Sequence, residues 1–115
     1  MTTSLTKAVY LVDKLAGLSD HDFIEHWTTT HADLAATMPG LRGYSINLPS
    51  PQQRSQRAKD GYAALWFDDR EALKAAWQSP EGQATAEDGT LFMAGTSPII
   101  VDVRVVCGPA REGAP

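Results

Sequence analysis

The chain has 115 residues, 43% hydrophobic and 21% charged, which is the composition of one globular domain and excludes disorder over its whole length. Its formal net charge is −4 and it has no run of basic residues, which argues against nucleic acid as a partner, because phosphate contact needs clustered lysine and arginine. The single cysteine, Cys107, excludes an internal disulfide and a thiolate metal cluster.

The beginning of the chain does not read as a signal peptide, and no stretch approaches the ~18 apolar residues of a membrane span. The lone cysteine gives no indication of an oxidising compartment. We therefore expect a cytoplasmic protein without a membrane partner.

The beginning of the chain predicts a strand followed by a long helix. Residues 7–13 form the short apolar run typical of a buried strand. Ser19 is a good N-cap, and Asp22 follows at the capping-box position. A Pro-Gly pair ends the apolar helical pattern, so we expect a helix over 20–37.

The rest of the chain alternates strands and helices again. The expected elements are a strand over 41–48, a long mobile loop over 49–60, a strand over 62–67, a helix capped by Asp68 that breaks near Pro80, a short helical turn over 81–87, and a strand over 99–106. The last strand is rich in β-branched residues, so we expect it deep in the sheet. One domain is expected over 1–107, followed by a Gly-, Pro- and Ala-rich flexible tail over 108–115.

This order, β-α-β repeated, is typical of an α+β domain whose helices cover one face of an antiparallel sheet. The first and last strands carry apolar residues on both sides. The face without helices should then be covered by a partner rather than by water. A second copy of the chain, stacked sheet against sheet, would cover it, so we expect a homodimer.

Three histidines, His21, His26 and His31, are the candidate titratable groups, and all lie in the first predicted helix. Their spacing of five residues places neighbours roughly 140° apart at ~100° per residue, so we do not expect them to converge on one metal. His31 lies with Trp27 on the apolar side of the helix, and we place His26 on the opposite, polar side. His31 is thus either a buried histidine satisfied by its neighbours or a general acid or base in a pocket.

Tyr44 begins the second strand, and its hydroxyl could reach the same space as His31 and form a hydrogen bond there. The alternative is a strand tyrosine that packs by its ring. Trp27 and Trp66 are typical of a core unless a cavity lies between them. The sequence has no G-x-S-x-G turn, dinucleotide fingerprint or phosphate loop, which argues against hydrolases of that type and against nucleotides.

Several motifs together resemble the EthD family. They are G-L-S-x-x-x-F-x-x-x-W-x-x-x-H-A-x-L-A over 17–35, M-P-G-L-R-G-Y over 38–44, G-Y-A-A-L-W-F-D-D-x-E-A-L over 61–73 and S-P-E-G over 79–82. The resemblance covers roughly residues 7–106, and it implies a ferredoxin-like βαββαβ subunit that pairs into a dimeric α+β barrel. In the characterised enzymes of that family, the histidine of W-x-x-x-H-A and the tyrosine after P-G-L are associated with the active site, and these are His31 and Tyr44 here. The family often has an acidic residue just before the W-F pair, where this chain has Ala63 and Ala64.

Family members include a methylmuconolactone isomerase and fungal enzymes that dehydrate or decarboxylate polyketide intermediates. The resemblance therefore implies a lyase or isomerase that uses no cofactor or metal and acts on a small cyclic, aromatic or polyketide-like substrate. His31 would move a proton and Tyr44 would hold a carbonyl or lactone oxygen, while Trp27, Trp66 and Asn47 would bind the substrate. Two alternatives stay open. One is a cofactor-free monooxygenase or a haem-binding barrel with His31 on iron, and the other is a non-catalytic carrier or accessory protein of an oxidative or degradation pathway.

Overall fold

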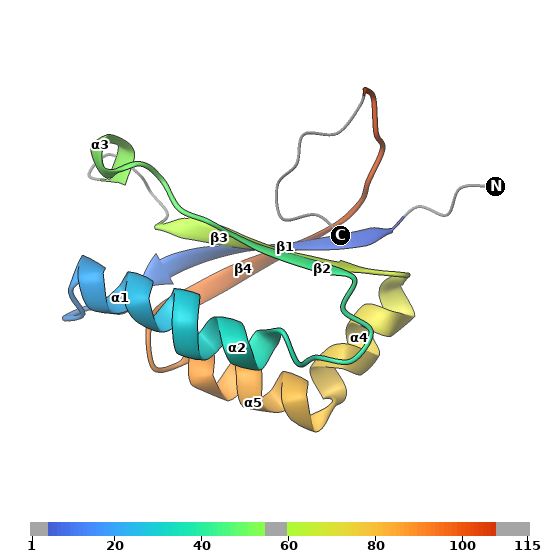
Figure 1. Ribbon diagram of the computed structural model, residues 1–115, viewed down its shortest axis with the longest axis horizontal. Coiled ribbons are helices and arrows are strands. Elements are labelled where there is room, and N and C mark those ends of the chain that lie inside the picture. The colour runs from blue at the N-terminus through green and yellow to red at the C-terminus, as the bar shows by residue number, and fades with distance from the viewer. Residues whose placement is uncertain (1–4, 55–59, 108–115) are drawn as a thin grey trace.

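The computed structural model describes residues 5–54 and 60–107, and it consists of a four-stranded sheet and a layer of helices (Figure 1). The strands are β1 Thr6–Lys14, β2 Gly43–Asn47, β3 Gly61–Phe67 and β4 Met93–Asp102. All neighbours pair antiparallel, in the order β2-β3-β1-β4. This is the ferredoxin-like α+β fold that the sequence predicts.

The helices that build the second layer lie on one face of the sheet (Figure 1). They are α1 Asp20–His26, the π-helical segment η1 Trp27–His31, α2 Ala32–Ala35, α4 Arg70–Gln78 and α5 Pro80–Gly89. The first three follow one another without a break and form the long helix predicted over 20–37. A helical turn, α3 Pro51–Arg54, lies beyond the end of β2, away from this layer (Figure 1).

Side-chain caps fix where the helices begin. The hydroxyl of Ser19 accepts a hydrogen bond from the backbone N–H of Asp22 at 3.0 Å, which confirms the predicted cap of α1. The predicted cap of α4 is wrong by one residue: Asp69 accepts from Ala72, and Asp68 instead pairs with Arg42. The cap is a residue with extended backbone, and Asp69 has that conformation.

The short helical turn predicted over 81–87 is a full helix, α5. Ser79 ends α4, and its hydroxyl accepts from the N–H of Gly82, so one side chain closes one helix and begins the next. Pro80 stands at the first helical position, where its missing N–H costs nothing. The connection between β3 and β4 thus contains far more helix than its polar sequence suggests.

The hydrophobic core lies between the sheet and the helices. On β1 and β3, alternate residues point toward the helices, among them Ala8, Val12, Leu65 and Phe67, and they pack with Phe23 of α1. The other face of the sheet carries the intervening residues, and apart from α3 at one end no helix of the described chain covers it (Figure 1). We call this second face the open face.

The last strand differs from its prediction in two ways. It spans Met93–Asp102 rather than 99–106, and it forms an edge of the sheet rather than its interior. Ile99 is 47% exposed and Ile100 42% exposed. β-branched residues favour an extended backbone at an edge as well as in the middle of a sheet, so their run does not determine depth.

Two predicted segments are only partly seen. The predicted loop over 49–60 contains α3, and the rest of it includes residues outside the described ranges. The predicted tail over 108–115 also lies outside the described residues. Within those ranges, no helix has both the length and the apolar character needed to cross a membrane.

Candidate functional site

A cavity of about 950 Å³ lies between the sheet and the helices. Strands β1 to β4 supply one wall, and η1, α4 and α5 supply the other. Three residues singled out from the sequence, Trp27, His31 and Tyr44, all line it. An apolar cavity with a few converging polar groups is the usual form of a small-molecule site.

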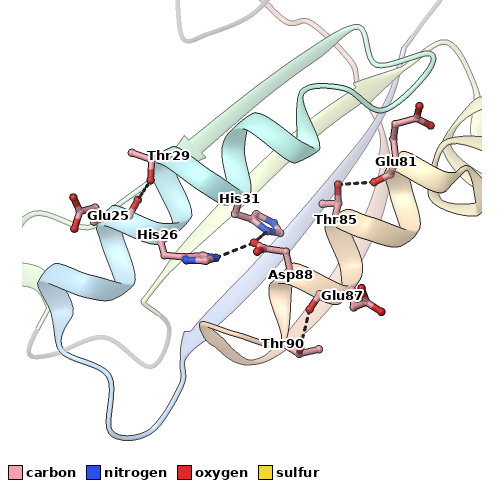
Figure 2. A network of polar contacts seen from close by, with 9 residues as sticks. All are labelled: Glu25, His26, Thr29, His31, Glu81, Thr85, Glu87, Asp88 and Thr90. Carbon is pink, nitrogen blue, oxygen red and sulfur yellow. Dashed lines mark hydrogen bonds and ion pairs between the residues drawn. The ribbon is translucent and has the colours of Figure 1, made fainter.

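His31 is held in the cavity wall by Asp88 of α5. The residue is 6% exposed, and its Nδ1 lies 2.9 Å from Oδ2 of Asp88 (Figure 2). A carboxylate only accepts hydrogen bonds, so with Asp88 ionised Nδ1 carries the proton. Nε2 then presents a lone pair, and it has no hydrogen-bond partner within the described parts of the chain. His31 is therefore a base oriented by a carboxylate, the arrangement that fixes the tautomer of histidines in many active sites.

Two opposing effects act on the charge of His31. Burial lowers the pKa of His31 below its ordinary value, because it penalises the charged imidazolium. Asp88 acts in the opposite direction on that pKa through its hydrogen bond and its charge. The net shift is downward, so His31 is neutral near pH 7 and available to accept a proton.

Asp88 was not singled out from the sequence, although it contacts both His26 and His31. It lies in the last turn of α5, a helix without a basic residue in that turn. A negative charge near a helix C-terminus is unfavourable by ~0.3–1 kcal/mol, because it faces the negative end of the helix dipole.

The sequence-based placement of His26 on the opposite, polar side of the helix is wrong. Its Nε2 lies 2.9 Å from the same Oδ2 atom of Asp88 that His31 contacts (Figure 2). Residues three apart share a helix face, so His26 flanks buried Phe23. The η1 segment also reduces the angle between His26 and His31 around the helix axis, because i→i+5 hydrogen bonds widen the turn. In this segment the N–H of Ala32 donates to the carbonyl oxygen of Trp27.

The two histidine rings also pack on one phenyl ring. The centroid of Phe92 lies 5.0 Å from that of His26 and 4.8 Å from that of His31. Phe92 is fully buried. Gly89 follows Asp88 directly, and a β-carbon there would stand 2.8 Å from Met93 and 3.9 Å from the His31 ring. These contacts hold the imidazoles against α5.

Tyr44 contributes a hydroxyl from the opposite wall, on β2. Burial raises the pKa of Tyr44 to about 12. The phenol therefore keeps its proton at any physiological pH and acts as a hydrogen-bond donor or acceptor rather than as a base. No protein partner of this hydroxyl is present among the described residues, which leaves it available to a bound molecule.

A second hydroxyl in the cavity, that of Tyr10, was not anticipated. The Nε1–H of Trp77 donates to this hydroxyl at 2.8 Å, and the two rings meet edge to face at 5.6 Å. Burial raises the pKa of Tyr10, so its own proton stays available for donation. Both residues line the cavity. Tyr10 lies inside an apolar strand sequence, which gave no reason to separate it from the core.

Trp27 lies in the cavity wall, whereas Trp66 and Asn47 do not. Trp66 follows Leu65 on β3 and so faces the open face, where the ammonium of Lys7 stands 4.9 Å from its ring centroid. Asn47 lines a smaller hollow of about 460 Å³ and donates to Ser45 and to the backbone of β3. Strand alternation separates these two side chains from Trp27 and Tyr44. A binding role for them would involve the open face rather than this cavity.

Charge at the cavity is uneven. The charged side chains along its wall are Arg70 and Lys74, both on α4, and no carboxylate of the described residues lines it. A group of ligand-like side chains, His21, Asp22 and Glu25, lies apart from it and is exposed. His26, His31 and Asp88 do not form such a metal-binding group within the described residues.

The family is decided by comparison with known sequences. The EthD domain matches residues 15–96 of this chain. The chain belongs to the EthD family. This confirms the resemblance drawn from the sequence motifs. No curated protein matches the chain.

Solved structures agree with this fold. An EthD family protein from Bacillus halodurans is 25% identical, with a TM-score of 0.74 over 87% of this chain and 99% of that chain. A dimeric ferredoxin-like protein of unknown function from Thermobifida fusca is 14% identical, with a TM-score of 0.70 over 90% and 94%. A cofactor-independent oxygenase from Streptomyces nogalater is 13% identical, with a TM-score of 0.63 over 91% and 97%. The last two likenesses show the fold alone.

Proposed function

We propose that this EthD protein is a cofactor-independent lyase or isomerase that acts on a small cyclic, aromatic or polyketide-like molecule. The observation that carries the proposal is His31, buried in the wall of an apolar cavity of about 950 Å³ and oriented by Asp88. A cavity of that size suits a molecule of one to a few rings. Its aromatic and aliphatic lining favours a largely apolar body with a few oxygen atoms.

The chemistry begins with a proton on a carbon next to a carbonyl group. Nε2 of His31 removes that proton, and the electron pair of the C–H bond moves to the carbonyl oxygen as an enolate. Tyr44 donates a hydrogen bond to this oxygen, where negative charge develops, and the hydroxyl of Tyr10 is a second available donor. Asp88 stabilises the imidazolium that forms.

The same imidazolium completes either reaction. For an isomerase, it returns the proton to a different carbon of the enolate. For a dehydratase, it gives the proton to a departing hydroxyl group, which leaves as water while the enolate re-forms the carbonyl. Neither route needs an oxidant, a reductant or a metal, because the electron pair stays within the substrate and the proton ends on the product.

Exchange of α-protons for deuterium tests this chemistry before the substrate is known. A panel of cyclic ketones, aromatic ketones and lactones is incubated with the protein in D₂O, and loss of the α-proton signal is followed by NMR. We expect exchange with at least one compound and a loss of about 10²–10⁴-fold in His31→Ala, the usual contribution of a positioned base. His21→Ala, which changes an exposed histidine of the same helix, is the matched control.

The outcomes separate the alternatives. Binding without exchange, unchanged in His31→Ala, would contradict the proposal and favour a carrier. Consumption of O₂ with a bound aromatic compound would favour a cofactor-free monooxygenase, and a Soret band on addition of haem would favour a haem protein.

We also propose that the chain forms a homodimer through its open face. Apolar side chains such as Val9, Leu11 and Val101 stand on this face beside Trp66. The three aliphatic side chains are partly exposed in the single chain, and sheet-on-sheet packing would bury them.

A further inference from the structure

His26 connects solvent to the cavity wall through a single carboxylate oxygen. The side chain of His26 is 27% exposed, whereas those of Asp88 and His31 are 9% and 8% exposed. Both histidines lie 2.9 Å from Oδ2 of Asp88, from opposite sides (Figure 2). One buried oxygen thus links an imidazole that water can reach with an imidazole that faces the cavity.

The charges of the two histidines must compete. Asp88 carries one negative charge, which balances one imidazolium. Two imidazolium rings on one carboxylate would leave a net positive charge in a poorly solvated place, which is unfavourable. The pKa of His31 reflects this competition, because a charged His26 lowers it while Asp88 raises it.

The other groups near His31 do not balance this charge. The remaining titratable or charged side chains that share the cavity wall with His31 are Tyr10 of β1, Tyr44 of β2, and Arg70 and Lys74 of α4. Burial keeps both tyrosines protonated and neutral, and the other two are cations. Asp88 is the one carboxylate that contacts His31 among the described residues.

We propose that His26 is a positioning residue that competes with His31 for the carboxylate of Asp88 and thereby tunes how readily His31 accepts a proton. This inference rests on the proposed function of the same site. A donor from His26 on Oδ2 takes up part of the negative charge that would otherwise favour a proton on His31. A positive charge on His26 would take up more of it, so the charge of His26 sets the proton affinity of Nε2 of His31.

This arrangement places the control of His31 at the surface. Nδ1 of His26 has no protein partner in the part of the chain that the structure describes, and water can reach the ring, whereas the oxygen that it shares with His31 is buried. A change of charge at His26 therefore acts on the cavity through Asp88, with no further group between them.

An NMR titration of the three histidine rings tests the coupling without any substrate. In the wild-type protein we expect the signals of His26 and His31 to titrate in two shared steps, since interacting sites do not titrate independently. His26→Gln keeps an N–H donor toward Asp88 but cannot become charged, so we expect a single step for His31 and a higher pKa of His31. His21→Gln is the control and should leave both signals unchanged.

A second variant keeps the test decisive if His26→Gln is unstable. Asp88→Asn removes the shared charge, and we expect it to lower the pKa of His31 and to remove the coupling. An identical His31 titration in wild type and in either folded variant would overturn the inference.

Deuterium exchange separates this inference from the proposed function. We expect the pH profile of exchange to move with the titration of His31 in His26→Gln. Coupled titration without exchange in any protein would contradict the proposed function and leave the coupling of the two histidines in place. Exchange that persists while the two histidines titrate independently would overturn the coupling alone.

Discussion

The phenol of Tyr44 offers a direct measure of how apolar the cavity is. Burial raises the pKa of Tyr44 from 10.0 to about 12, whereas the unfolded chain has the ordinary value. Between these values the folded state holds a proton that the unfolded state has lost. The free energy of unfolding therefore falls as pH rises above about 10, and the stabilisation by the protonated phenol is complete below that pH.

The magnitude follows from the shift. One pKa unit corresponds to about 1.4 kcal/mol, so a shift of two units is worth about 3 kcal/mol in full, of which about 2 kcal/mol is lost by pH 12. Tyr44→Phe has no ionisable group and should escape this loss. Over one pH unit above 10, the wild type should therefore lose up to about 1.4 kcal/mol more than the variant.

Urea unfolding at several values between pH 9 and about pH 11 gives these free energies, and the absorbance of phenolate reports ionisation directly. Tyr62→Phe controls for loss of a hydroxyl at an exposed position, since Tyr62 is 39% exposed. If wild type and Tyr44→Phe lose stability equally above pH 10, the Tyr44 hydroxyl is well solvated. The hydrogen bond proposed from Tyr44 to a substrate oxygen would then lose its physical basis.

Three further predictions concern stability and assembly. Gly61→Ala should cost about 2–5 kcal/mol in urea unfolding, because Gly61 has a φ of 156° and a β-carbon there would lie 2.8 Å from the Trp27 ring; a cost below 1 kcal/mol would contradict the packing described. Burial lowers the pKa of His31, so below about pH 6.5 the unfolded state binds more protons than the folded state, and the free energy of unfolding should decrease as the pH is lowered. Urea unfolding of His31→Gln should show a smaller decrease, and an equal decrease would refute the lowered pKa. Val9→Glu places a charge on the open face, so light scattering should show a monomer where the wild type is a dimer, and a dimeric variant would exclude this face as the interface.

Features that depend on neighbours in the sequence were predictable. The cap formed by Ser19 and the apolar side of the first helix, with Trp27 and His31, follow from spacing along a few turns. Side chains of β2 point alternately to the open face and toward the helices, so the strand period predicts which face Tyr44 takes. The shared motifs then identified the family, and the resemblance suggested roles for His31 and Tyr44 that no periodicity can supply.

Features that depend on contacts across the fold were not predictable from spacing. Asp88 lies 57 residues from His31 along the chain, and nothing local marks the two as partners. Trp66 looked like a neighbour of Trp27 by type, but one step along β3 moves a side chain to the other face of the sheet. The position of β4 at an edge likewise depends on distant pairing, because β1 pairs with β3 on one side and with β4 on the other.

The π-helical segment shows how a local irregularity builds the site. The hydroxyls of Thr28 and Thr29 donate to the carbonyl oxygens of Ile24 and Glu25, one turn earlier, at 2.7 Å and 2.5 Å. Such bonds often bend a helix, and the run of threonines after Trp27 is a poor helix-forming sequence. The wide turn lies at this run and brings His26 and His31 to one carboxylate, whereas a regular helix would place residues five apart roughly 140° from each other.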